Sequence, residues 1–176
     1  LYSEAKWAQE VNIRASKEVI LECWNEFGNH FQRYYSPVER HRCEGADTLL
    51  LTMGSYSETA MEAIDRMREE GKDIGLLKLR LWRPFPFDEI RQAVKQAKVL
   101  IVLDRALSFG GQGGPVCSEI RSALYSEENK PKIISFVGGL GGRDITVANF
   151  TEIINQGIEI SQKGSSKEFE IFGVRE

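Results

Sequence analysis

The sequence predicts an α/β fold of three layers, in which a mostly parallel sheet carries helices on both faces and follows a linker helix. Between Thr48 and Ile158, four short apolar runs alternate with segments of helical periodicity. Alternating strands and helices give right-handed crossovers and a parallel sheet. Two of the runs end in glycine clusters, which suits buried strands that turn sharply into helices. We therefore expect an α/β domain over residues 47–160, between a helix and loop over residues 1–46 and a polar tail over residues 161–176.

The first 46 residues predict a long helix and a connecting loop. From Ala5 to about Phe31, apolar side chains recur at four-residue spacing and form a broad stripe. No strand precedes this helix, so its stripe is expected to pack on the following domain or on another chain. Residues 33–47 contain Pro37 and Gly45 among mixed charges, which predicts a loop or a short irregular crossing.

The next segment predicts two strands, each followed by a helix. The apolar runs Thr48–Met53 and Ile74–Leu81 have the length of buried strands. Ser55 and Glu58 have the spacing of a capping box at the start of the first helix. Asp88 is expected to cap the second helix.

The second half of the chain repeats the pattern. Strands are predicted at Val99–Leu103 and Lys132–Val137, each followed by glycines. One helix is expected from Pro115, which suits a first helical turn, to about Tyr125. Thr146 is expected to cap the last helix. In the tail, Phe169–Ile171 alternates in the manner of a short edge strand.

Charge and composition narrow the function classes. The 176 residues carry a formal net charge of −3, without the basic face that attracts a nucleic-acid backbone. No apolar run approaches the length of a membrane span, and the N-terminus has no signal-peptide pattern. We therefore expect a cytoplasmic protein that binds neither nucleic acid nor membrane. The chain begins with Leu1 rather than methionine, which indicates a processed start or a piece of a longer chain.

No metal centre is predicted within the chain. Cys23, Cys43 and Cys117 are scattered and form no C-x-x-C pair, which disfavours a zinc site or an iron–sulfur cluster. Reduced, partly buried thiols are the favoured interpretation. His30 and His41 are isolated and are interpreted as surface or packed histidines.

The glycine clusters do not match a nucleotide-binding motif. The pattern G-x-G-x-x-G fails twice, because Val116 and Asp144 occupy the sixth positions, and no Gly-Lys-Ser/Thr is present. We interpret the glycines mainly as residues for tight turns and for close backbone approach to a neighbouring surface. A small anion held at the helix starts of Pro115 and Thr146 is the lesser alternative.

Two acid–base pairs lie at predicted strand ends, Asp104–Arg105 and Arg143–Asp144. Arginine binds carboxylates and phosphates bidentately, but no nucleophile or paired carboxylate accompanies these pairs. We therefore favour cross-pairing that pins two neighbouring loops together, and we predict no catalytic residue. The candidate interface or anion-contact residues are Arg83, Asp104, Arg105, Gly110, Gly113, Gly114, Arg143 and Asp144.

Several segments in a fixed order resemble one family. They are Leu77–Arg80 with Arg83–Pro86, Val102–Arg105, Ser108–Gly110, Gly114–Pro115 and Gly138–Asp144. In this order and spacing they resemble the C-terminal part of the alpha subunit of 2-oxoacid:ferredoxin oxidoreductases, of which pyruvate:ferredoxin oxidoreductase (pyruvate synthase) is the best-known member. The resemblance covers roughly residues 47–158 and implies a transketolase C-terminal-like domain.

The resemblance implies a complex that converts a 2-oxoacid to an acyl-CoA by oxidative decarboxylation and passes the electrons to ferredoxin. The expected 2-oxoacid is pyruvate. Such a complex uses thiamine diphosphate, Mg, iron–sulfur clusters and coenzyme A, none of which we expect this chain to bind alone. The resemblance also implies an oligomer, in which residues 83–86, 104–115 and 138–144 contact other domains or subunits of the oxidoreductase. The alternative is a stand-alone α/β module that binds a small anionic ligand at its glycine-rich loops.

Overall fold

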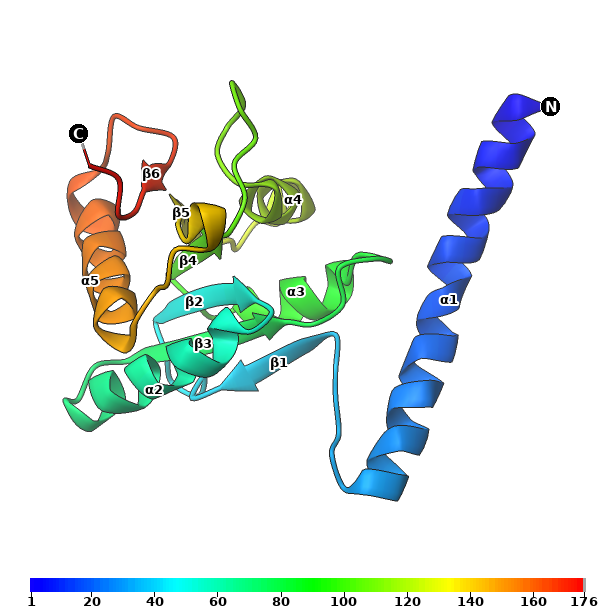
Figure 1. Cartoon of the computed structure of the whole chain (residues 1–176), viewed down its shortest axis with the longest axis horizontal. Coiled ribbons are helices and arrows are strands. Elements are labelled where there is room, and N and C mark those ends of the chain that lie inside the picture. Colours follow the sequence, from blue (N-terminus) through cyan, green and yellow to red (C-terminus); the bar gives the residue numbers. More distant parts are fainter. Residues whose placement is uncertain (176) are drawn as a thin grey trace.

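A mostly parallel sheet forms the centre of the structure, a computed structural model that describes residues 1–175 (Figure 1). The strands lie in the order β1-β3-β2-β4-β5-β6, and β1 runs antiparallel to β3 whereas the other pairs are parallel. The strands are β1 (Val38–His41), β2 (Thr48–Met53), β3 (Ile74–Leu79), β4 (Val99–Asp104), β5 (Lys132–Val137) and β6 (Glu170–Ile171). The helices are α1 (Tyr2–Phe31), α2 (Tyr56–Glu69), α3 (Phe87–Val94), α4 (Pro115–Leu124) and α5 (Val147–Lys163), with a 3-10 turn, η1, at Leu140–Gly142. The predicted α/β class is confirmed.

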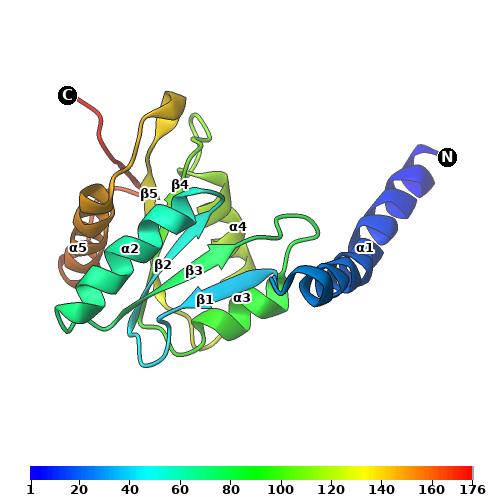
Figure 2. The ribbon, with the colours of Figure 1, turned by 60° about the horizontal axis from the view of Figure 1, so that its bottom comes forward.

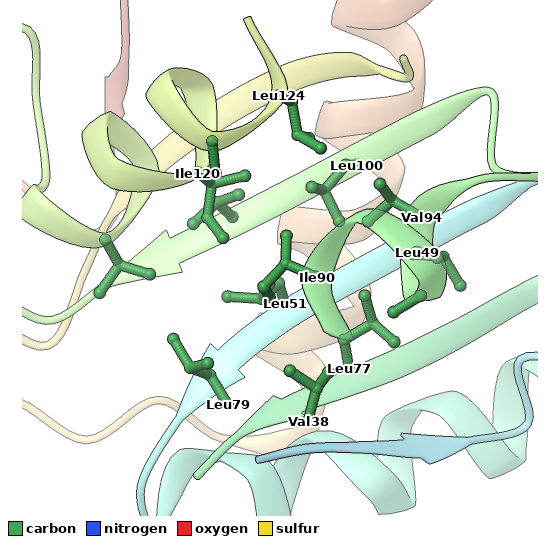
Figure 3. Packing of buried hydrophobic residues seen from close by; sticks show 14 of the residues in the cluster. Val38, Leu49, Leu51, Leu77, Leu79, Ile90, Val94, Leu100, Ile120 and Leu124 are labelled. Atoms are coloured by element: carbon green, nitrogen blue, oxygen red, sulfur yellow. The ribbon is translucent and has the colours of Figure 1, made fainter. Parts of the chain in front are cut away.

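Helices cover both faces of the sheet, because successive side chains of each strand point to opposite faces. Leu49 and Leu51 of β2 belong to the core under α3 and α4, whereas Leu50 belongs to the core under α2 and α5. Figure 3 shows the first core, in which Ile90 of α3 and Ile120 of α4 lie over the strand side chains. Both cores are almost free of solvent exposure, and their burial drives the three-layer arrangement.

Strand β1 corrects the prediction of an irregular segment over residues 33–47. Val38 pairs with Leu79 and His41 with Leu76, so β1 forms one edge of the sheet. Its sequence, Val-Glu-Arg-His, has a single apolar residue. A strand at the edge of a sheet has a neighbouring strand on one side only, so fewer of its side chains are buried. Periodicity could not reveal it, since four residues with three polar side chains give no apolar run. The predicted edge strand near the C-terminus is confirmed as β6.

Of the three helix caps that the sequence predicts, one is confirmed and two are wrong. The Thr146 hydroxyl accepts a hydrogen bond from the Asn149 N–H, and Asn149 reciprocates, so the predicted cap is confirmed. The capping box predicted at Ser55 is wrong, because Ser55 already has helical dihedrals and its side chain makes no cap bond. The cap predicted at Asp88 is also wrong, because α3 begins one residue earlier and Asp88 lies in its first turn.

Replacing Thr146 with alanine is expected to lower the free energy of unfolding by about 1 kcal/mol, because the first turn of α5 loses its side-chain acceptor. Urea denaturation followed by circular dichroism measures the change. Ser55→Ala serves as the matched control, since its side chain caps nothing, and it should change the same quantity by less than about 0.5 kcal/mol. Equal losses in the two variants would contradict the assignment.

Helix α1 stands apart from the sheet and is joined to it by an extended segment (Figures 1 and 2). Of its residues only Gly28 is buried, whereas the stripe residues Val19 and Phe31 are 58% and 63% exposed. The described domain therefore does not cover the stripe, and packing on another chain stays a prediction. No helix within residues 1–175 is both long and apolar enough to cross a membrane.

Candidate functional site

The carboxyl ends of four parallel strands meet at one edge of the sheet. Four loops follow them, over residues 54–55, 80–86, 105–114 and 138–146, and we call these the carboxyl-edge loops. Strand β2 lies between β3 and β4, so the chain leaves β2 toward one side of the sheet and later returns on the other. Ligand and partner sites of open α/β sheets lie at this kind of switch point. The carboxyl-edge loops are therefore the candidate site.

Asp104, the last residue of β4, fixes the base of the longest of these loops, residues 105–114. Its side chain is buried, with 1% relative exposure, and its carboxylate accepts hydrogen bonds from the Val116 N–H (2.8 Å) and the Cys117 N–H (2.9 Å). These amides belong to the first turn of α4, whose positive dipole end suits a carboxylate. Burial raises the pKa of the Asp104 carboxyl, and the two amide hydrogen bonds oppose that rise. The carboxylate joins the end of β4 to the start of α4.

The capping by Asp104 bears on two expectations from the sequence. The cross-pairing of Asp104 with an arginine of the neighbouring loop is wrong, because the carboxylate turns inward to α4. Backbone groups connect the loops instead, since the Gly138 N–H donates to the Asp104 carbonyl oxygen (2.9 Å). An anion at the start of α4 is disfavoured as well, because a buried carboxylate already occupies that helix end.

Gly114 is required by the same contact. A side chain at this position would place its Cβ on the Cβ and Cγ atoms of Asp104. The backbone of Gly114 is extended (φ −82°, ψ 149°), so glycine serves close approach here rather than an unusual dihedral angle. The close approach at this position is to Asp104 of the same domain, and an approach of the glycines to a neighbouring surface stays a prediction.

Tyr56, the first residue of α2, contacts two of the carboxyl-edge loops and was missed in the sequence. Its hydroxyl donates to the Arg143 carbonyl oxygen (3.1 Å), and the Arg105 guanidinium lies over its ring at 4.7 Å. Gly139 approaches Tyr56 so closely that a Cβ there would overlap the tyrosine oxygen. The ring packs edge-on against Phe150 of α5, 6.1 Å between centroids. The only available signal was its position directly after the Gly54–Ser55 turn at the same sheet edge.

The loop between Arg105 and Gly114 projects from the sheet edge (Figure 1). The Ser108 N–H donates to the Gly113 carbonyl oxygen, and the Gly111 N–H donates to the Ser108 carbonyl oxygen, both at 2.9 Å. Gly110 and Gly113 have positive φ angles of 73° and 102°, which favour glycine. The tip residue Phe109 is 92% exposed.

The other candidate residues lie at different places on this edge. Arg105 and Arg143 meet at Tyr56, and Arg143 and Asp144 are exposed beside η1. Arg83 lies away from them, where its guanidinium contacts the Glu119 carboxylate (2.7 Å) and stacks on Trp82 at 4.4 Å. The eight candidates therefore do not form one cluster.

A hollow of about 330 Å³ between α1, β3 and the start of α2 contains the buried Lys78. The Lys78 ammonium contacts the carboxylates of Glu58 (2.8 Å) and Glu39 (3.5 Å). The hydrogen bond from Lys78 lowers the pKa of Glu58. The hollow is thus charge-balanced by the chain's own residues.

Within residues 1–175 no group of three His, Cys, Asp or Glu side chains is placed to hold a metal ion. Burial raises the pKa of the Cys117 thiol, which keeps it in the unreactive protonated form. His41 is engaged with Asp65 at 2.9 Å, which agrees with its interpretation as a packed histidine. What the site offers is a set of loops that are hydrogen-bonded within the domain and carry exposed apolar and cationic side chains.

Comparison with known proteins gives consistent matches. The family model described as pyruvate:ferredoxin oxidoreductase core domain II matches residues 46–150. The pyruvate synthase subunit PorA of Methanothermobacter thermautotrophicus is 41% identical over 155 residues, which are 88% of this chain and 39% of the relative. The PorA subunit of Pyrococcus furiosus is 38% identical over 92% of this chain and 40% of its own length. The ketoisovalerate oxidoreductase subunit VorA of Pyrococcus horikoshii is 37% identical over 91% of this chain and 41% of its length.

Two solved structures share the fold. A split-gene transketolase, described as an inactive beta4 tetramer, has a TM-score of 0.54 at 14% identity and matches 73% of this chain and 44% of that chain. The 2-oxoglutarate:ferredoxin oxidoreductase of Magnetococcus marinus has a TM-score of 0.51 at 23% identity and matches 74% of this chain and 21% of that chain. At these identities the likeness concerns the fold alone, and it agrees with the transketolase-like architecture expected from the resemblance.

This chain spans about two fifths of the length of the curated relatives it matches. The family model nevertheless covers more than half of the sequence, so this chain belongs to the pyruvate:ferredoxin oxidoreductase core domain II family.

Proposed function

We propose that this chain forms the transketolase C-terminal-like part of the alpha subunit of a 2-oxoacid:ferredoxin oxidoreductase. Its role there is to support the oxidative decarboxylation of the 2-oxoacid to an acyl-CoA by packing against the other parts of the enzyme. The observation that carries this proposal is the carboxyl edge, whose loops are fixed internally by Asp104 and Tyr56 while their tips remain exposed. An exposed surface whose loops are hydrogen-bonded within the domain suits contact with another part of an enzyme.

Pyruvate is the proposed 2-oxoacid. The two pyruvate synthase subunits described above are 41% and 38% identical to this chain, whereas the ketoisovalerate oxidoreductase subunit is 37% identical. These identities are close, so the substrate assay below includes 2-ketoisovalerate and 2-oxoglutarate. Electrons from the reaction are proposed to leave through the complex to ferredoxin, and the working enzyme is proposed to be an oligomer.

Thiamine diphosphate, Mg, iron–sulfur clusters and coenzyme A are proposed to bind to the other parts of the complex. This chain's own residues do not fit them. The helix start that follows its main glycine loop is capped by the Asp104 carboxylate, which would repel a diphosphate. Cys43 and Cys117 are buried apart from the exposed Cys23, so the cysteines do not form a cluster ligand set.

Reconstitution tests the proposal. This chain is mixed with the thiamine-binding and cluster-bearing parts of the enzyme, and reduction of a viologen dye that depends on 2-oxoacid and coenzyme A is measured. Activity that requires this chain is expected, with pyruvate giving the highest kcat/KM. Stable assembly without any gain in activity over a mixture that lacks this chain would refute the supporting role.

Replacing Arg143 with alanine is expected to weaken assembly with the partner chains by roughly tenfold, because an exposed cation is removed from the carboxyl edge. The free energy of unfolding should change by less than about 0.5 kcal/mol, since Tyr56 bonds to the backbone oxygen of Arg143. Arg66→Ala on α2, an exposed arginine outside the carboxyl-edge loops, is the matched control. An assembly constant equal to that of the control would show that Arg143 is not part of the interface.

A further inference from the structure

Helix α1 stands apart from the sheet, yet it contacts the rest of the chain at two separated places (Figures 1 and 2). Near its C-terminal end, the ring of Tyr35 packs against Phe27 (5.8 Å between centroids) and Trp24 (6.4 Å). At mid-helix, the Lys17 ammonium contacts the Glu89 carboxylate of α3 at 2.7 Å. Because a helix rises 1.5 Å per residue, Lys17 and Phe27 lie roughly 15 Å apart along its axis. Two separated contacts oppose rotation of the helix about either one.

The last turn of α1 closes onto the segment that connects it to β1. Gly28 is buried, and a Cβ there would lie 2.4 Å from Cδ1 of the Tyr34 ring. Glycine is unfavourable inside a helix relative to alanine, so the close approach of the tyrosine explains its presence. Gln32 ends the helix in a left-handed conformation (φ 56°), and its N–H donates to the Gly28 carbonyl oxygen at 2.8 Å. This reversal of the chain places Tyr34 and Tyr35 against α1.

The connecting segment is in turn attached to the sheet. The Pro37 carbonyl oxygen accepts hydrogen bonds from the N–H groups of Arg80 (3.0 Å) and Leu81 (3.2 Å), directly after β3. The Arg80 guanidinium lies over the Tyr35 ring at 4.7 Å, and it also pairs with the Glu39 carboxylate of β1. A cation over an aromatic ring is attracted by the ring's electrons. Arg80 therefore connects Tyr35 to the edge of the sheet.

We propose that residues 28–37, together with Arg80, form an elbow that holds α1 at one fixed angle to the sheet. Tyr35 is the centre of this elbow, because its ring contacts both the helix and Arg80. The Lys17–Glu89 ion pair supports the same angle from mid-helix, and its side chains are only 27% and 30% exposed, which limits screening by salt. The angle of α1 is thus set within this chain. The inference does not depend on the proposed function, since it concerns the conformation of this chain alone.

The distance between two spin labels tests the elbow, measured by pulsed electron paramagnetic resonance on the full chain. The reference chain carries Ser3→Cys at the start of α1 and Ser122→Cys on α4, both at exposed positions. Cys23→Ser removes the exposed native thiol, and the other two cysteines are buried. A narrow distance distribution is expected for the reference chain. Tyr35→Ala should broaden it at least about twofold, because the helix is then free to pivot on the connecting segment.

Tyr35→Phe is the matched control, since it keeps the ring that packs against Trp24 and Phe27 and should retain the narrow distribution. Tyr35 belongs to neither core, so both variants should fold and give the circular dichroism of the reference chain. Equal widths in the reference chain and in Tyr35→Ala, whether narrow or broad, would overturn the elbow. A distribution for Tyr35→Phe as broad as that for Tyr35→Ala would overturn it too. Neither result would affect the proposed function, which the reconstitution tests separately.

Discussion

Asp104→Ala is expected to lower the free energy of unfolding by about 3 kcal/mol. The substitution leaves the buried N–H groups of Val116 and Cys117 without an acceptor, and each such loss costs about 1–3 kcal/mol. It also removes the link between the end of β4 and the start of α4. Urea denaturation at neutral pH measures the loss, and assembly with the partner chains should weaken with it. A loss below about 1 kcal/mol would show that water replaces the carboxylate.

The pH dependence of stability gives an independent check on Asp104. Burial raises the pKa of this carboxyl above the value of about 3.9 for an unfolded aspartate. The native state therefore binds the proton more tightly than the unfolded state, and this group's contribution to stability falls as the pH rises from about 4 through the native pKa. In Asp104→Asn the titration is absent, so the free-energy difference between the two proteins should shift in favour of the variant over that range. A difference that does not change with pH would contradict the raised pKa.

Gly114→Ala is expected to cost about 2–4 kcal/mol, close to the loss at Asp104, because the new Cβ overlaps atoms of a short side chain that two hydrogen bonds hold in place. The loop or α4 must move, and the exposed tip would move with it. Gly111→Ala is the matched control in the same loop, since its Cβ would lie 3.2 Å from the nearest atom, the Ser108 carbonyl oxygen. It should cost less than about 1 kcal/mol. Thermal denaturation of both variants distinguishes the overlap at position 114 from a general intolerance of alanine in the loop.

The central strands could be predicted because each is buried on both faces. Such strands consist mostly of apolar residues, and Lys132–Val137 is predicted with the bounds that the structure shows. The predicted strand at Val99–Leu103 extends one residue further and ends on Asp104. Strand β1 could not be predicted, because an edge strand needs apolar residues on one side only and its charged residues pair with neighbouring elements.

The sequence predicted at which edge of the sheet the candidate site lies, but not which side chains contact one another there. Glycine clusters mark the ends of β4 and β5, and the alternation of strands and helices brings those ends to one edge. The role of Asp104 was not readable, because an acid at a strand end can face an arginine, a ligand or a helix start with equal ease. Only the position of α4 decides that its carboxylate faces two backbone amides. Tyr56 was missed for the same reason, since Arg105, Arg143 and Phe150, which contact it, lie 49 to 94 residues away along the chain.

The sequence by itself determined the class of the fold, the order of its central elements and the family of the chain, because apolar periodicity and motif spacing are local properties. The tertiary structure decided which groups meet: Asp104 with the start of α4, Tyr56 with Arg105 and the Arg143 backbone, and the exposure of Phe109 at a closed loop tip. It also decided that most of α1 is left uncovered by the described domain. Contacts between distant segments depend on how layers pack and strands register, and a pattern read along the chain does not contain that information.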